Sequence, residues 1–85
     1  MFTNDKIVAL TAIETPAGQV KIGDIVVFQH RLNHVRMGVV LAIAAPNNLV
    51  LKQVVCVRYD EDNVQRIYRK PNCTIKNYQV STVIH

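Results

Sequence analysis

The sequence has few of the residues that build disulfide frameworks or membrane spans. Two of its 85 residues are cysteines, Cys56 and Cys73, too far apart for a Cys-x-x-Cys pair and too few to cross-link a small secreted domain. The longest apolar run, from Met37 to Pro46, is about half of the ~20 residues that a membrane-spanning helix needs. Asp5 near the start does not fit a signal peptide. We therefore expect a cytoplasmic protein without membrane contact.

Clusters typical of catalysis or metal binding are also missing. His30 and His34 stand four residues apart, but a zinc site needs two further ligands, and Cys73 does not complete the set. Cys73 lies near Lys70 and Lys76, cations that lower a thiol pKa, yet no histidine adjoins it to act as a base. We predict neither an enzyme nor a bound metal or cofactor.

The composition is that of one small folded domain with a positive charge. Residues 1–85 are long enough for a single domain with a small core, and 49% of them are hydrophobic while 19% are charged, which is ordinary for a globular chain. Ten Lys and Arg against six Asp and Glu give a net charge of +4. This excess favours phosphate-rich or acidic partners.

The chain is predicted to be all-β, because no window combines helical spacing with a capping residue. Extended segments rich in branched residues alternate with turns such as ETPAG, HRLN, APNN and DEDN. The predicted strands are 6–13, 24–29, 35–44, 49–59 and 64–69, with further extended pieces at 19–23, 70–77 and 78–85. Five to seven short antiparallel strands in so short a chain favour a small, partly open barrel.

Alternation along the strands predicts which side chains point inward. One face of the strand 35–44 carries Val35, Met37, Val39, Leu41 and Ile43, and we expect this face to lie in the core. The hairpin that contains DEDN is expected to have a five-residue or bulged connection. In that register Val57 lies opposite Ile67, and Arg58 lies opposite Arg66 on the outer side of the sheet with Tyr68.

The stretch VKIGDIVVF, followed by a loop and VRMGVVLAI, resembles the start of SH3-like small barrels of the KOW and Tudor-like group. The resemblance covers Val20 to Ile43. It implies a turn at Gly23 with Asp24 bonded to local amides, and a bend or close backbone approach at Gly38. It also implies binding of nucleic acid, ribosomal components, RNA polymerase or a peptide. An aromatic cage for methylated ligands is not expected, because only Tyr59 and Tyr68 come close to forming one.

Two basic segments, HRLNHVR and RIYRKPNCTIK, are the candidate binding residues. Arginine binds phosphate oxygens through two hydrogen bonds, and an aromatic ring between cations gives a base a surface to stack on. The predicted nucleic-acid-binding residues are Arg31, His34, Arg36, Arg58, Arg66, Tyr68, Arg69, Lys70 and Lys76. The alternative is that both segments are solvated surface that keeps a small barrel soluble.

The leading functional hypothesis is a non-enzymatic module that binds RNA or DNA through a basic face. The alternative is a small protein-binding module or inhibitor, for example one encoded by a phage, that presents an edge strand such as STVIH or an apolar patch to one host protein partner, and an acidic protein surface is the other expected partner. An unpaired edge strand would also permit a homo-oligomer.

Overall fold

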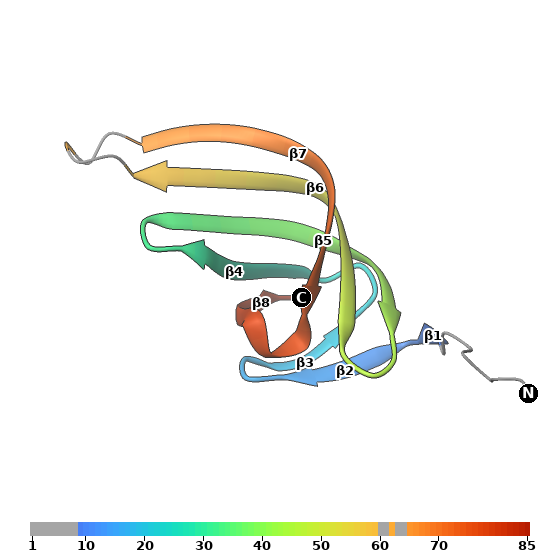
Figure 1. Cartoon of the computed structure of the whole chain (residues 1–85). Coiled ribbons are helices and arrows are strands. Elements are labelled where there is room, and N and C mark those ends of the chain that lie inside the picture. Colours follow the sequence, from blue (N-terminus) through green and yellow to red (C-terminus); the bar gives the residue numbers. More distant parts are fainter. Residues whose placement is uncertain (1–8, 60–61, 63–64) are drawn as a thin grey trace, which may run out of the picture.

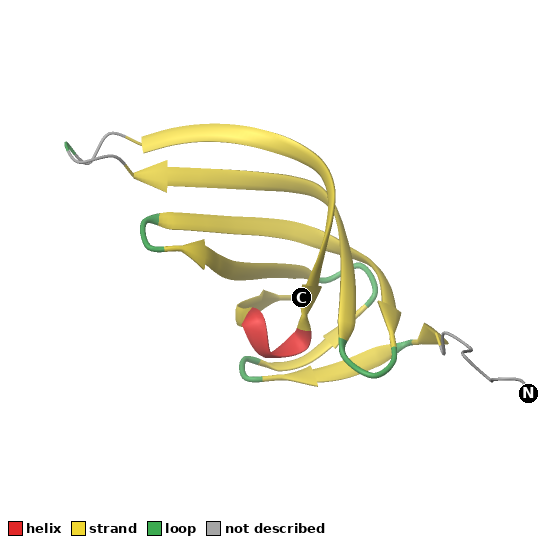
Figure 2. Cartoon of the chain, in the orientation of Figure 1, coloured by secondary structure: helices red, strands yellow, loops and turns green. Residues whose placement is uncertain are grey.

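The computed structural model describes residues 9–59, 62 and 65–85. Eight strands and one short 3-10 helix make up this part (Figures 1 and 2): β1 (Ala9–Leu10), β2 (Ala12–Thr15), β3 (Gly18–Lys21), β4 (Ile25–Arg31), β5 (His34–Ala44), β6 (Asn48–Tyr59), β7 (Gln65–Lys76), η1 (Asn77–Gln79) and β8 (Val80–Ile84). The all-β class is confirmed. Three strands are longer than expected, with 11 or 12 residues each.

The main sheet is antiparallel with the strand order β7-β6-β5-β4-β8, and β1 adds to β5 beside it. β2 and β3 form a separate hairpin. In Figure 1 this hairpin, β8 and η1 gather below the right-hand part of the main sheet. Within the described residues β7 and β8 are the two edges, so the sheet is not closed into a barrel.

The long strands bend along one line, where the ladder is irregular. β6 has one extra residue relative to β5 between Lys52 and Val55, and Gln53 in this bulge has a positive φ of 53°. β5 in turn has one extra residue, Leu41, between Val40 and Ala42. β-bulges bend a strand and increase its twist. The bulges therefore let β5 and β6 curl over the β2–β3 hairpin and β8 (Figure 1).

The bend places the core on one side of the main sheet, which we call the core face; the opposite side is the outer face. The buried side chains are Val20, Val26, Phe28, Val40, Ile43, Leu49, Leu51, Val54, Cys56, Ile75 and Val80. They come from β3 to β8, so nearly every strand contributes to one core.

The predicted inward face of β5 is wrong at most of its positions. Met37 is 37% exposed and Leu41 45% exposed, whereas Val40 is buried. Ile43 is buried as predicted, because the bulge at Leu41 shifts the alternation by one residue and brings Val40 and Ile43 to the same side. On β6 the bulge likewise buries Leu51 and Val54, three residues apart.

The predicted register of the β6–β7 hairpin is confirmed. Val57 pairs with Ile67 and Arg58 with Arg66, and the pairing of Tyr59 with Gln65 leaves the five residues 60–64 as the connection. The side on which this pair lies was predicted wrongly. Cys56 is buried, so Arg58 and Arg66 lie on the core face and not on the outer face.

The predicted turns between β3 and β4 and between β5 and β6 are present. Gly23 has φ 95°, and the Asp24 carboxylate accepts a 2.9 Å hydrogen bond from the Lys21 amide, as expected. APNN connects β5 to β6. The segments around Pro71, predicted as two pieces, form the single strand β7, and Pro71 is tolerated there because β7 is an edge strand.

Two further expectations concern the chain's ends and the membrane. The predicted strand 6–13 begins outside the described residues, and its described part divides at Thr11 between β1 and β2. Among the described residues, no helix has the length and apolar character needed to cross a membrane.

Gly38 is predicted to be necessary for the close approach of β5 to β6. A Cβ atom at Gly38 would lie 3.0 Å from the Leu51 Cβ, 3.2 Å from the Lys52 carbonyl oxygen and 3.2 Å from a methyl of Val54. Gly38→Ala should lower the free energy of unfolding by about 1–3 kcal/mol, measured by urea denaturation, because these neighbours form the bend and have little room to move. Gly23→Ala is the control: its added Cβ atom would have no heavy atom within 4 Å, so any loss of stability there reports backbone strain alone. A Gly38→Ala protein as stable as the wild type would contradict this account.

Candidate functional site

A group of cations occupies the core face at the end of the sheet where the β4–β5 and β6–β7 connections lie (left in Figure 1). We call it the basic cluster: Arg31, His34, Arg36, Arg58, Arg66 and Lys70. Arg58 on β6 lies directly between His34 on β5 and Arg66 on β7, and Arg31 on β4 pairs with His34. Directly opposed residues have Cβ atoms about 5 Å apart, so four basic side chains stand side by side across four strands.

The next row of the core face joins the cluster to the hydrophobic core. It runs from Phe28 through Arg36 and Cys56 to Tyr68, each residue opposite the next. Phe28 and Cys56 are buried, Arg36 is half-buried and Tyr68 is 38% exposed. The Arg36 Nε is buried without a hydrogen-bond partner among the described residues. Buried donors normally have an acceptor, so this nitrogen is an exception within the site.

His30 belongs to this site, although the sequence analysis considered it only as a zinc ligand. Desolvation, followed by the positive charges of Arg36 and Arg31, lowers the pKa of His30 below 6.5, and His34 and Lys70 act in the same direction. Its place was readable from the alternation Val26, Phe28, His30 along β4, had Phe28 been assigned to the core.

His34 has the same electrostatic environment. Desolvation lowers its pKa below 6.5, and the charges of Arg58, Arg31 and Arg36 lower it further. Protonation of either ring is thus disfavoured first by desolvation and then by the positive charges of the neighbouring arginines.

Carboxylates in the described part lie mostly away from the cluster. Glu14 is on β2, and Asp24 at the start of β4 accepts from the Lys21 amide and lies 3.1 Å from the His85 ring nitrogen. Asp62 is in the β6–β7 connection, near the cluster, and makes an interaction of its own. The rest of the predicted acidic loop, Asp60 and Glu61, lies outside the described residues.

Two of the predicted binding residues lie away from the basic cluster and from Tyr68 beside it. Arg69 pairs with Val55 and lies on the outer face. Lys76 lies at the other end of β7, where its ammonium group donates a 2.6 Å hydrogen bond to the Asn48 side chain. The seven other predicted residues are brought together: Arg31, His34, Arg36, Arg58, Arg66, Tyr68 and Lys70.

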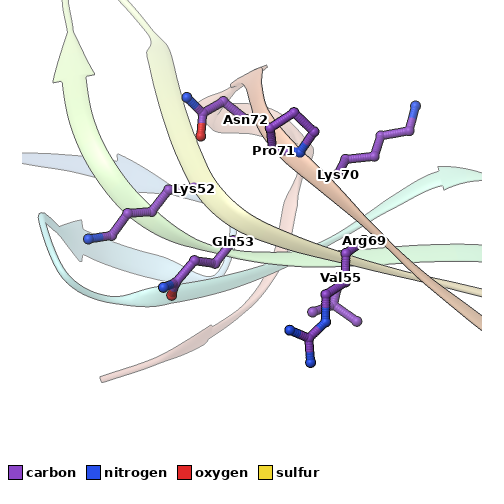
Figure 3. A pocket seen from close by; sticks show the side chains of 7 residues that line it. All are labelled: Lys52, Gln53, Val55, Arg69, Lys70, Pro71 and Asn72. Carbon is purple, nitrogen blue, oxygen red and sulfur yellow. The ribbon is translucent and has the colours of Figure 1, made fainter.

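A surface hollow of ≈ 620 Å³ lies at the bulge that contains Gln53 (Figure 3). It is lined by Lys52, Gln53, Val55, Arg69, Lys70, Pro71 and Asn72. Figure 3 shows Val55 and Arg69 extending to one side of the sheet and Lys70 to the other. The hollow thus lies at the edge between the two faces, and Lys70 is its only member in the basic cluster.

Both cysteines are free thiols that lie in the core or pack against it. Cys56 is a buried packing residue. Cys73 lies in β7, not in a loop, and burial raises the pKa of its thiol; Arg36 and Lys70 oppose this rise, and Cys56 adds to it. Lys70 thus lowers the thiol pKa as the sequence suggested, but burial outweighs it and the net direction is upward. Within the described ranges, no three His, Cys, Asp or Glu side chains come together as a metal site.

Comparisons with known proteins give no relative: no protein-family model, curated protein or solved structure matches the chain significantly.

The row of opposed cations should cost stability in the free protein. Like charges directly opposite on a sheet destabilise it by a few tenths of a kcal/mol to about 1 kcal/mol. Arg58→Thr, which removes the central cation and keeps a good strand residue, should therefore raise the melting temperature by about 2–6 °C in low salt. The gain should shrink in 1 M NaCl. Arg69→Thr on the outer face is the matched control and should give no such gain; equal effects at both positions would contradict the electrostatic explanation.

The two histidines predict how stability depends on pH. Their pKa values are lowered on folding, so the unfolded chain binds more protons than the folded chain as the pH falls through about 6.5. The free energy of unfolding should be highest above that pH and decrease between about pH 7.5 and pH 5.5, measured by urea denaturation. The double variant His30→Gln, His34→Gln should reduce this dependence, and an unchanged slope would refute the assignment. His85 is unchanged in the double variant, so any effect of His85 is the same in the variant and in the wild type.

Proposed function

We propose that the protein is a non-enzymatic module that binds nucleic acid through the basic cluster. The observation that carries this proposal is the row of basic side chains from Arg31 to Arg66 across four strands, beside the partnerless Nε of Arg36. Arg31 and Arg58 add like charge to this row, and a ligand with several phosphates offsets their repulsion in the bound state.

The cluster suits a chain of phosphates better than a single anion. Its cations extend from β4 to β7, a width of roughly 15 Å at the usual strand spacing. Successive phosphates of a nucleic acid can contact Arg31, Arg58 and Arg66 along this row. Arginine guanidinium groups bind each phosphate through two parallel hydrogen bonds.

Tyr68 supports a nucleic acid over other polyanions. It ends the row on the core face that contains Arg36, next to the row that ends at Arg66. It is 38% exposed, so its ring is accessible from the same side as the cations. A base that stacks on such a ring gains about 1–3 kcal/mol, which is largest for single strands. Tyr59, by contrast, lies on the outer face, so the two tyrosines do not form a cage.

The alternative function, binding of one protein partner, rests on a different element. β8 pairs only with β4 in the described part, so its other edge is available for an added strand. Recovery of one stoichiometric protein that persists after nuclease treatment, and is lost on changing β8 but not the basic cluster, would favour this function. The SH3-like likeness, the cytoplasmic location and a phage or viral source stay predictions of the sequence.

Binding should weaken steeply as salt rises, and it should depend on the cations of the core face but not on those of the outer face. Fluorescence anisotropy with labelled oligonucleotides should show affinity falling roughly 50-fold for single strands and roughly 150-fold for duplexes between 50 and 200 mM salt, if about four phosphates are neutralised. Arg58→Glu should weaken binding at least about tenfold. Arg69→Glu makes the same charge change one strand away on the outer face, and it should bind within about twofold of wild type.

Charge reversal at Arg31 and Arg36 together tests the remainder of the cluster. This double variant should abolish binding while its circular dichroism stays that of the wild type. Absence of salt-dependent binding to either kind of oligonucleotide would refute the proposal. Equal losses for Arg58→Glu and Arg69→Glu would mean that net charge and not the cluster is responsible.

A further inference from the structure

An exposed tyrosine lies on the core face with a cation of the basic cluster on either side of it. Tyr68 and Lys70 are two residues apart on β7, so their side chains lie on the same face, about 7 Å apart. Arg58 on β6 is a diagonal neighbour of Tyr68, because it pairs with Arg66, two residues before Tyr68. Diagonal neighbours are about 7–8 Å apart, within reach of long side chains. A phosphate on either cation is therefore close to the tyrosine ring.

The position of Tyr68 at the border of the sheet leaves its ring accessible. β7 has β6 on one side and no described strand on the other (Figure 1). Tyr68 is 38% exposed, whereas Phe28, at the opposite end of the same row, is buried in the core. Tyr68 is thus the aromatic ring of that row that a ligand can reach.

We propose that the ligand of the basic cluster is a single strand of nucleic acid, one base of which stacks on Tyr68 while phosphates on either side of that base contact Arg58 and Lys70. This inference rests on the proposed function and names the class of nucleic acid that the site takes. Bases of single-stranded DNA and RNA stack on aromatic side chains in this way, largely independently of sequence, because every base has an aromatic face.

A duplex does not fit the same arrangement. Inside a duplex both faces of a base are covered by the neighbouring base pairs, so no face is left for Tyr68. Extruding a base costs the energy of unpairing and unstacking, which is least for a base that is already single-stranded. The phosphate contacts by themselves are open to both forms, and duplex DNA has the higher charge density. Tyr68 is therefore the residue that determines the preference for a single strand.

A second exposed tyrosine on the same hairpin gives a contrast. Tyr59 is 41% exposed but lies on the outer face, where it pairs with Gln65 and has Ile67 as a diagonal neighbour. Neither of these two neighbours is a cation. Tyr59 therefore matches Tyr68 in exposure and lacks the phosphate contacts, which makes it the control position.

Fluorescence anisotropy compares a labelled single strand with a duplex of the same length and sequence, in DNA and in RNA. At about 200 mM salt, where phosphate contacts are weakened, the wild type should bind the single strands at least about fivefold more tightly than the duplexes. This factor is the contribution of one stacked base at its lower limit.

Variants locate the stacked base. Tyr68→Leu should weaken single-strand binding about 5- to 150-fold and change duplex binding by less than about twofold, whereas Tyr68→Phe keeps a ring and should bind nearly as the wild type does. Tyr59→Leu, the same substitution on the outer face, should leave the binding of both forms unchanged. Inorganic polyphosphate carries phosphates without bases, so Tyr68→Leu and the wild type should bind it equally.

The possible failures are distinguishable. Duplexes bound as tightly as single strands, with the loss in Arg58→Glu preserved, would overturn this inference and leave the proposed function intact. The inference would also be wrong if Tyr68→Leu bound single strands as the wild type does, or lost polyphosphate binding to the same degree, since the ring would then have no contact with a base. If neither form shows salt-dependent binding, the proposed function fails and this inference fails with it.

Discussion

The bend of the long strands determines the rest of the structure. One extra residue in β6 and one in β5 interrupt the ladder, and Gly38, opposite the extra residue of β6, lets the two strands approach closely. Beyond the bend the strands curl over β8 and the β2–β3 hairpin and enclose the core. On the other side of the bend the same strands continue flat toward their connections, with no layer below them in Figure 1. A small hydrophobic core and the exposed basic cluster are thus two parts of one sheet face.

The sequence was sufficient for the fold class and for strand pairing, and insufficient for the direction of the side chains. The register that pairs Arg58 with Arg66 was predicted because it keeps a charged residue from lying opposite Val57. The structure has this register. Which side faces the core could not be read from alternation, because β6 is apolar at both Val54 and Val55 and a bulge shifts the phase. Bulges depend on contacts with other strands, which local patterns do not encode.

The same uncertainty explains the outcome for the candidate site. Seven of nine predicted residues come together, since neighbouring strands and a correct register place them in adjacent rows. Arg69 was included because it adjoins Lys70 in sequence, but consecutive strand residues point to opposite faces. His30 was omitted because its neighbours on the core face, Arg36 and Lys70, come from other strands. Residues that are neighbours across a sheet can be far apart in the sequence, so a list of sequence neighbours does not find them.

Pro71 on β7 has a consequence for how the chain behaves at high concentration. A sheet with long, strongly apolar strands and an unprotected border is prone to recruit further chains and to grow into fibrils. Pro71 has no amide hydrogen to offer to an incoming strand, and Arg69 and Lys70 directly before it would repel an identical segment aligned alongside. The border at β7 is therefore a poor template for amyloid growth, even though the sheet it terminates is otherwise rich in the residues that favour such growth.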